Sequence, residues 1–244
     1  MSARLDSQAP VALVTGATSG FGREVARKLA AEGFSVLAHG RDASRGAVVV
    51  REIAEAGGHA RFIGADLTSV DAVRRLAEDA GEVDVLVNNA GFSWFGPTAD
   101  LDPAVFDQMF AANVRAAYYL VAAIAPGMAK RGAGNIINLG SMAGQIGLAG
   151  GAAYSATKAA LAAMTRSWAA EFSPQGVRVN TVAPGPAYTE GAAPERITAL
   201  GDTTLLARAA EPAEIADIVA FLASPKAAYI TGAVIPVDGG RTAI

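Results

Sequence analysis

The stretch Thr15-Gly16-Ala17-Thr18-Ser19-Gly20-Phe21-Gly22 lies between a short apolar run, Val11–Val14, and a segment of helical periodicity that continues to Glu32. Glycine has no Cβ atom, so the chain can turn sharply here and approach a pyrophosphate closely. The free amides at the start of a helix also carry partial positive charge. Ordinary strand-to-helix turns are rich in glycine too, but the position of this turn favours binding of a dinucleotide.

Short apolar runs typical of strands alternate with helical patterns along the rest of the chain. The strand-like runs are 11–14, 35–38, 60–63, 83–87, 135–139, 177–182 and 233–236, and the helical patterns include 22–32, 44–56, 69–79, 103–125, 154–172 and 212–223. Parallel strands need crossover connections, which cover both faces of the sheet with helices. The pattern predicts an α/β protein with a Rossmann-type doubly wound parallel sheet of about seven strands, flanked by helices.

The domain organisation follows from the same alternation. No linker or repeat interrupts it, so we expect a flexible tail at residues 1–10 and a single dinucleotide-binding catalytic domain at 11–244. The least regular stretch, 184–210, holds three prolines and three glycines. Such a segment is typical of a substrate loop or lid.

Composition excludes several classes of protein. The 244 residues are 52% hydrophobic and 18% charged, with a net charge of −3, which gives no electrostatic footprint for nucleic acid or an anionic membrane. The longest apolar helical run, 116–125, stops at Pro126, short of the roughly 20 residues that a membrane span needs. Without cysteine, and with only two histidines, no metal site is expected. We expect a cytoplasmic protein with no nucleic-acid or membrane partner.

The residues after the second strand-like run, His39-Gly40-Arg41-Asp42, bear on the choice of cofactor. An acidic residue there accepts both hydroxyls of an adenosine ribose, whereas an arginine pairs with a 2′-phosphate. Arg41 therefore favours NADP, and NAD stays possible. Two simpler readings remain open: Arg41 is a solvated surface charge, and Asp42 caps the following helix.

Tyr154 and Lys158 are four residues apart in a helical pattern, so they share one face of that helix. A neighbouring ammonium group favours the phenolate and lowers a tyrosine pKa from about 10. The pair is therefore suited to acid–base chemistry. The alternative is an ordinary amphipathic tyrosine beside a solvated lysine.

Taken in order, these motifs resemble the short-chain dehydrogenase/reductase family, in the branch with TGxxxGxG and YxxxK motifs that includes 3-oxoacyl reductases. The resemblance covers Val11 to Gly240. It is carried by the glycine turn, Asp66-Leu67-Thr68, Asn88-Asn89-Ala90-Gly91, Asn113, Ser141, Tyr154, Lys158, and Pro184-Gly185 with Thr189.

The resemblance implies four catalytic residues. Tyr154 is expected to act as general acid or base, Ser141 to hydrogen-bond the carbonyl oxygen, Lys158 to hold the nicotinamide ribose, and Asn113 to position a water. Hydride transfer leaves oxyanion character on the substrate, so two donors converging on one oxygen fit the chemistry.

The resemblance also implies a cofactor site and a substrate wall. The expected cofactor contacts are Gly16, Thr18, Ser19, Gly20, Phe21, Gly22, Arg41, Asp66, Leu67, Asn89, Ala90, Gly91, Tyr154, Lys158, Pro184, Gly185 and Thr189. The expected substrate contacts are Ser141, Phe92, Trp94, Met142, Gln145, Ile146, Tyr154 and Tyr188, with Phe95 beside them. The aromatic residues among them could equally be core and surface residues.

The sequence thus predicts an NADP(H)-dependent oxidoreductase that interconverts a ketone or 3-oxo compound and a secondary alcohol. One rival is an NAD-dependent secondary-alcohol dehydrogenase. A rival of another class is a non-catalytic dinucleotide-binding regulatory protein. The expected partners are a small carbonyl or alcohol substrate and, because the end of the chain resembles the tetramer-forming end of the family, three further copies in a homotetramer.

Overall fold

The computed structural model describes residues 9–190 and 193–244. Its centre is a parallel sheet of seven strands in the order β3-β2-β1-β4-β5-β6-β7. The strands are β1 Val11–Val14, β2 Ser35–Gly40, β3 His59–Gly64, β4 Val85–Asn88, β5 Gly134–Leu139, β6 Val177–Pro184 and β7 Val234–Val237. The predicted doubly wound sheet is confirmed. The strand order reverses between β1 and β4, the place where such folds bind ligands.

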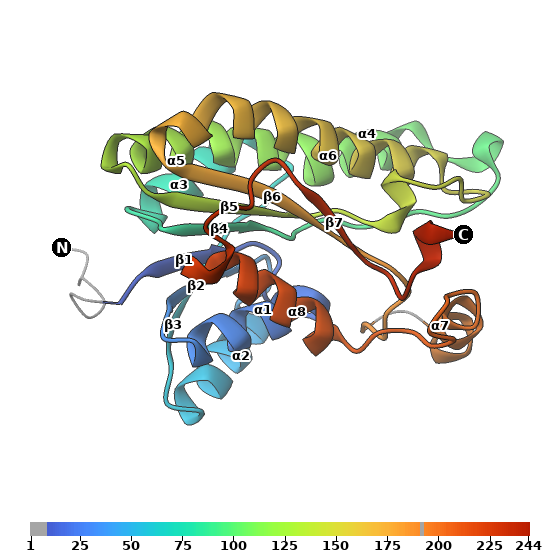
Figure 1. The fold of residues 1–244 in the computed structure, drawn as a ribbon, viewed down its shortest axis with the longest axis horizontal. Coiled ribbons are helices and arrows are strands. Elements are labelled where there is room, and N and C mark those ends of the chain that lie inside the picture. The colour runs from blue at the N-terminus through green and yellow to red at the C-terminus, as the bar shows by residue number, and fades with distance from the viewer. Residues whose placement is uncertain (1–8, 191–192) are drawn as a thin grey trace.

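Helices cover both faces of the sheet (Figure 1). They are α1 Gly20–Ala31, α2 Ala43–Glu55, α3 Val70–Ala80, α4 Pro103–Phe110, α5 Ala116–Arg131, α6 Ala152–Phe172, α7 Pro194–Gly201 and α8 Pro212–Ala223. In Figure 1, α1, α2 and α8 lie on one side, and α3, α5 and α6 lie on the other. Two hydrophobic cores result, one against each face of the sheet.

The strands alternate between these two cores. Ala12 and Val14 belong to the core under α1 and α8, whereas Leu13, between them, belongs to the core under α3 and α5. Because both faces of the sheet are buried, residues that point to either face of a strand such as β1 are apolar. This is why the sequence shows continuous apolar runs rather than alternation.

Strand register brings the predicted motifs to one edge of the sheet. Val14 lies beside Val87, and Asn88 beside Asn138, so β1, β4 and β5 end at nearly the same level. The turn after β1 is tied to the end of β4, because the Thr15 hydroxyl accepts from the Asn89 and Ala90 amides at 3.0 Å each. The segments that follow these strands therefore share one rim.

The prediction that a helix stops at Pro126 was wrong. The helix continues to Arg131 and ends at Gly132, which has a φ of 72° and is followed by a bond from Ala133 N to Met128 O. Pro126 is tolerated because it lies on the exposed side of α5, where water can satisfy the carbonyl oxygen one turn earlier, at Ala122.

The helical stretch Pro103–Arg131 is also longer than predicted. Over its 29 residues it has a window of mean hydropathy 1.2, long and apolar enough to cross a membrane by length and composition alone. Half of that window is buried inside the fold, and its apolar residues form part of the core under α3 and α5. The core accounts for this apolar character.

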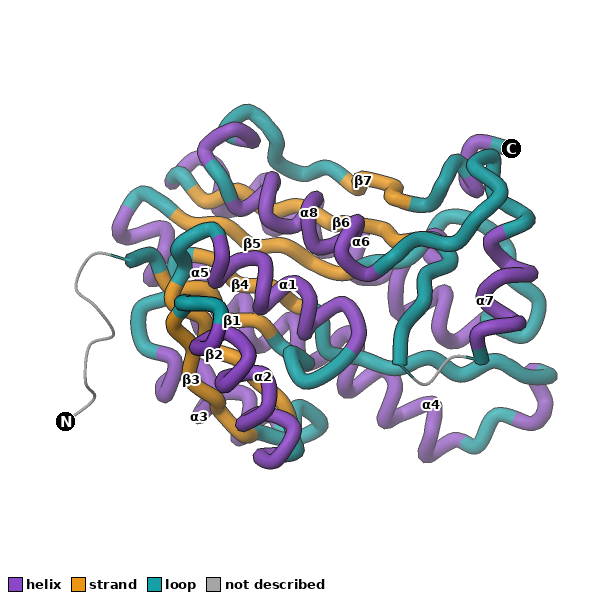
Figure 2. Tube along the Cα trace, turned by 90° about the horizontal axis from the view of Figure 1, so that it is seen from below, coloured by secondary structure: helices purple, strands orange, loops and turns teal. Residues whose placement is uncertain are grey.

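The segment 184–210, predicted to be irregular, contains the helix α7. Figure 2 shows α7 beyond the ends of β6 and β7, at the edge where these strands finish. The hydroxyl groups of Tyr188 and Thr198 lie 3.0 Å apart and join the start of the segment to α7. Parts of two predicted features lie outside the described residues: positions 191–192 of the loop and positions 1–8 of the tail.

Candidate active site

A cleft of about 510 Å³ opens at the rim where β1, β2, β4 and β5 end. Its wall collects residues from separate stretches of the chain. Among the predicted ones are Gly16, Thr18, Ser19, Gly20, Phe21, Arg41, Asp66, Leu67, Asn89, Ala90, Gly91, Phe92, Tyr154, Lys158 and Thr189. The fold therefore brings most of the predicted cofactor residues and two of the predicted catalytic residues into one cavity.

The glycine turn needs its glycines for two different reasons. Gly16 and Gly20 have φ angles of 65° and 51°, in the left-handed region that favours glycine. Gly22 instead lacks room, because a Cβ there would lie 2.2 Å from Gly16 O and 2.4 Å from Asn89 Nδ2. The Asn89 amide donates to Thr15 O and Gly16 O, at 2.8 and 3.2 Å. Its Nδ2 group therefore supports the turn.

At the far end of the cleft, Asp42 caps α2. Its Oδ1 accepts from the Ser44 and Arg45 amides at 2.8 and 3.1 Å, so the capping interpretation is the one that the structure supports. Arg41 lines the cleft, and Arg45, which the sequence did not single out, lines it as well. Two guanidinium groups therefore stand where an acidic residue would have indicated NAD.

Asp66 also lines this end of the cleft. Its Oδ1 accepts from the amide and the hydroxyl of Thr68 at 3.0 and 2.9 Å, and these two bonds are the main reason that its pKa is lowered. Asp66 is thus held ionised at neutral pH.

Glu190, at the start of the predicted loop, reaches back across the glycine turn. Its carboxylate pairs with Arg23 at 3.2 Å and with Arg45 at 3.0 Å, and Arg45 also donates to Thr18 O. Thr189 lies over Gly20, since a Cβ on Gly20 would come within 3.6 Å of the threonine Cβ. The loop therefore lies directly against the turn.

Tyr154 and Lys158 lie on the first turns of α6, and Ser141 follows β5. The Lys158 Nζ is 5.7 Å from the centroid of the Tyr154 ring and donates to Leu139 O at 2.7 Å. A Ser141–Tyr154 side-chain hydrogen bond favours the phenolate. The segment after β5 and the start of α6 thus bring these three groups together at the end of β5.

The pKa values differ from the sequence-based expectation. Burial raises the pKa of Tyr154, and the bond with Ser141 offsets part of that rise. Burial lowers the pKa of Lys158 to about 8. The expected lowering of the tyrosine pKa by its lysine neighbour is not found, because removal of the phenol from water is the larger effect.

Asn113 stands in a π-helical segment, Ala111–Arg115, between α4 and α5. Its Oδ1 accepts from Phe92 N at 3.0 Å, and its Nδ2 donates to Phe92 O and to Thr157 Oγ1 at 2.9 and 3.1 Å. A Cβ on Gly91 would lie 2.6 Å from Asn113 Oδ1. The Asn113 side chain therefore ties the loop that follows β4, here called the β4 loop, to α6, and both of its amide hydrogens are donated to these partners.

The structure does not bring all of the predicted substrate residues to the cleft. Phe92 lines the cleft, and Phe95 packs against Tyr154 with 5.6 Å between ring centroids. Trp94 instead lines a separate groove of about 520 Å³ between α4 and α6. The other five, Ser141, Met142, Gln145, Ile146 and Tyr188, do not line the cleft, and Met142 is only 7% exposed.

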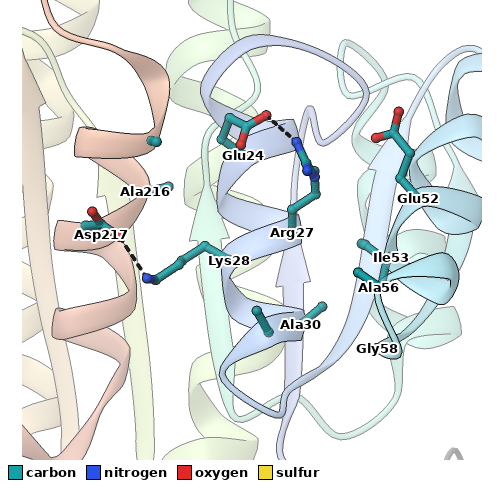
Figure 3. Close-up of a pocket in the computed structure, with 12 residues that line it drawn as sticks. Glu24, Arg27, Lys28, Ala30, Glu52, Ile53, Ala56, Gly58, Ala216 and Asp217 are labelled. Carbon is teal, nitrogen blue, oxygen red and sulfur yellow. Dashed lines mark hydrogen bonds and ion pairs between the residues drawn. The ribbon is translucent and has the colours of Figure 1, made fainter.

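A third hollow, on the outer surface of α1, α2 and α8, contains paired charges. Figure 3 shows Lys28 reaching toward Asp217 and Arg27 toward Glu24. These ion pairs have N–O distances of 2.9 and 3.0 Å. None of its lining residues belongs to the glycine turn or to the Tyr154 group. It is separate from the candidate active site.

A glycine turn at the sheet's switch point, together with a tyrosine and a lysine at the same rim, defines the class of dinucleotide-dependent oxidoreductases. Residues 10–199 match the short chain dehydrogenase family. The chain belongs to this family, and it is an NAD(P)-dependent enzyme that acts on alcohols and carbonyl compounds.

Three relatives illustrate the similarity. Galactitol 2-dehydrogenase (L-tagatose-forming) of Cereibacter sphaeroides is 39% identical, over 95% of this chain and 94% of its own. The 3-oxoacyl-[acyl-carrier-protein] reductase of Vibrio harveyi is 35% identical, over 97% and 98%. A blue fluorescent protein from a metagenomic library, solved in complex with NADPH, is 38% identical over 95% and 97%, with a TM-score of 0.89.

Proposed function

We propose that the enzyme interconverts a ketone and a secondary alcohol with NADP(H) as the preferred cofactor and Tyr154 as its acid–base group. The observation that carries this proposal is the meeting of Tyr154, Lys158 and the glycine turn in one cleft. A bound nicotinamide supplies hydride to the carbonyl carbon, or accepts it from the alcohol.

The raised pKa of Tyr154 keeps its phenol protonated at neutral pH. In the reducing direction Tyr154 donates that proton to the substrate oxygen as negative charge develops there. Ser141, which is hydrogen-bonded to Tyr154, is the second donor to the same oxygen. Lys158, with a pKa of about 8, is mostly charged at pH 7, and in this proposal its ammonium group holds the nicotinamide ribose.

The residues of the cleft fit a dinucleotide along its whole length. Gly16 and Gly20 leave the turn open for a pyrophosphate, and the ionised Asp66 can accept from an exocyclic amine of adenine. At the other end of the cleft, the proposal has Lys158 and Tyr154 hold the nicotinamide ribose. Asn113 acts on this site by fixing the β4 loop, and we propose that a water at the site is held through its backbone.

Arg41 sets the preference for NADP in this proposal, with Arg45 beside it. A charge-assisted bond to a phosphate contributes about 1.5–3 kcal/mol. We therefore expect Arg41→Ala to raise the KM for NADPH by about 10- to 100-fold and to leave the KM for NADH nearly unchanged. Steady-state assays with both cofactors measure this.

Arg51→Ala is the matched control for Arg41→Ala. Arg51 lies on α2 outside the cleft and pairs only weakly, at 3.8 Å, with Glu55. This variant should behave as the wild type with either cofactor. Equal KM values for NADPH and NADH in the wild-type enzyme, or equal changes of both in Arg41→Ala, would refute the preference for NADP. A lower KM for NADH would support the rival NAD-dependent dehydrogenase.

Among carbonyl substrates, the exposed rings of Phe92 and Phe95 beside Tyr154 favour a small or cyclic apolar ketone. A 3-oxoacyl thioester is the second candidate, supported by the 35% identity with the Vibrio harveyi reductase. The resemblance to 3-oxoacyl reductases implies basic residues for carrier contact at the positions of Gly132 and Gln175. Both residues are uncharged here, which argues against the carrier-bound form.

We also propose that the chain assembles as a homotetramer in the cytoplasm. The exposed Phe106 and Tyr118 on α4 and α5, and the fully exposed Tyr229, are apolar surfaces suited to contact with further copies. The absence of cysteine suits a reducing compartment. Sedimentation velocity at micromolar concentration distinguishes four chains from one.

A further inference from the structure

His39 is buried in the wall of the cofactor cleft, near the end of β2, with only 2% of its surface exposed. Its Nδ1 accepts the Gly16 amide of the glycine turn at 3.3 Å. Its Nε2 lies 3.1 Å from the carbonyl oxygen of Ala65, directly before Asp66. One imidazole ring therefore links two segments that line the adenosine end of the cleft.

These two partners fix the protonation state of the ring. The Gly16 amide is a donor, so Nδ1 must present a lone pair, and the Ala65 oxygen is an acceptor, so Nε2 must carry the hydrogen. The neutral Nε2–H tautomer satisfies both bonds. The imidazolium cation carries hydrogens on both nitrogens and has to give up the bond with Gly16.

The surroundings also oppose the cation. Burial is the main cause of a pKa for His39 below its usual 6.5, and the charge of Arg41 adds to the effect, whereas the bond to Ala65 acts in the opposite direction. Arg41, two residues further along the chain, is the charged group that acts on the ring, and Asp66 follows the ring's partner Ala65 in the sequence. Arg41 and burial together outweigh the favourable bond.

We infer that His39 is a positioning residue for the dinucleotide: its neutral ring ties the Gly16 amide of the glycine turn to the end of β3, and its protonation breaks that bond. This inference rests on the proposed function. It adds a lower pH limit to cofactor binding: the affinity for the dinucleotide falls when His39 is protonated. His39 itself has no part in hydride transfer.

The effect should fall on binding and not on the chemical step. In the sheet, β1 and β4 separate β2, which carries His39, from β5, where Ser141 and Lys158 meet. The Asn89 amide holds the carbonyl side of the turn through Thr15 O and Gly16 O. Loss of the His39 bonds therefore weakens the adenosine end while the turn stays attached.

The first test uses the wild-type protein and its only two histidines. In ¹⁵N NMR at pH 7.5, the His39 ring should give two signals of the Nε2–H tautomer: Nδ1 without a hydrogen and Nε2 with one. On titration it should stay neutral to a pH below 6.5. His59, exposed at the start of β3, is the internal reference. A His39 signal that is protonated at pH 6.5, or that shows the Nδ1–H tautomer, would overturn the inference.

The second test is the Kd for NADP⁺, measured by fluorescence between pH 5 and 8. Below the pKa of His39 the wild-type Kd should rise by as much as about tenfold per pH unit. His39→Leu should bind NADP⁺ about tenfold more weakly than the wild type at pH 8, with a kcat within about twofold of the wild-type value. Its Kd should not show the additional rise at low pH. His39→Gln, which keeps a donor for Ala65, should fall between them.

Two controls keep the outcomes separate. The 2′-phosphate titrates near pH 6 by itself, but it does so in every variant, so the comparison with His39→Leu removes it. His59→Gln should follow the wild type. Parallel Kd profiles for the wild type and His39→Leu would refute the role of His39 and leave the enzyme assignment standing. No binding of NADP⁺ by the wild type at pH 8 would refute the proposed function itself.

Discussion

Replacement of Tyr154 by phenylalanine is expected to lower kcat by about a thousandfold while the Kd for NADP⁺ stays within about twofold. The change removes only the hydroxyl group, and general acid–base catalysis of this kind contributes about 10²–10⁴ in rate. The ring contact with Phe95 is kept in the variant. The measurement is turnover with the best ketone from a panel of cyclic ketones, hydroxyketones and 3-oxoacyl thioesters.

Tyr118→Phe is the matched control for this prediction. Tyr118 is half exposed on α5, contacts Tyr119 and Trp168, and has no place in the cleft. Its variant should turn over as the wild type does. If Tyr154→Phe kept more than a tenth of the wild-type kcat, another group would have to supply the proton. The non-catalytic rival predicts no turnover of any ketone by the wild type.

Replacement of Gly22 by alanine is expected to abolish dinucleotide binding, with a rise in Kd of at least about 100-fold. The added Cβ has no space, because the backbone oxygen of Gly16 and the Asn89 amide lie 2.2 and 2.4 Å from it. A backbone atom cannot swing aside as a flexible side chain can, so the turn itself has to move. Overpacking of this kind also costs about 1–3 kcal/mol of stability.

Titration calorimetry with NADP⁺ and urea unfolding of the same variant separate the two effects. Gly147→Ala is the control, because a Cβ on Gly147 meets nothing within 4 Å and its φ is not in the left-handed region. We expect that variant to bind and unfold as the wild type does. Wild-type affinity in Gly22→Ala would mean that the dinucleotide does not rest on this turn.

The sheet could be predicted from the sequence because its cause is local. Both faces of the central strands are buried, so β1 and β4 appear in the sequence as nearly unbroken apolar runs. The sequence also offered the capping of the following helix by Asp42 as one of two simpler interpretations of the Arg41-Asp42 pair, and the structure has this cap. Pro126 misled the prediction because its tolerance depends on which side of α5 faces water, and only the packed structure decides that.

The candidate site was predicted less completely, since its details depend on contacts between distant segments. The partners of Asn113 and His39 are 21 or more residues away along the chain, and no spacing rule finds them. Trp94 was grouped with Phe92 because they are close in sequence, yet they line different cavities. The rise of the Tyr154 pKa follows from burial, which the Tyr–Lys spacing does not reveal.

The central claim is that one cleft presents the glycine turn to a dinucleotide and the Tyr154 group to its reactive end. A crystal structure of the protein with NADP⁺ tests it most directly. We expect the pyrophosphate over Gly16 and Gly20, the 2′-phosphate against Arg41, and the nicotinamide ring facing the hydroxyls of Tyr154 and Ser141. A dinucleotide bound outside this cleft, or a nicotinamide ring turned away from Tyr154, would contradict the account.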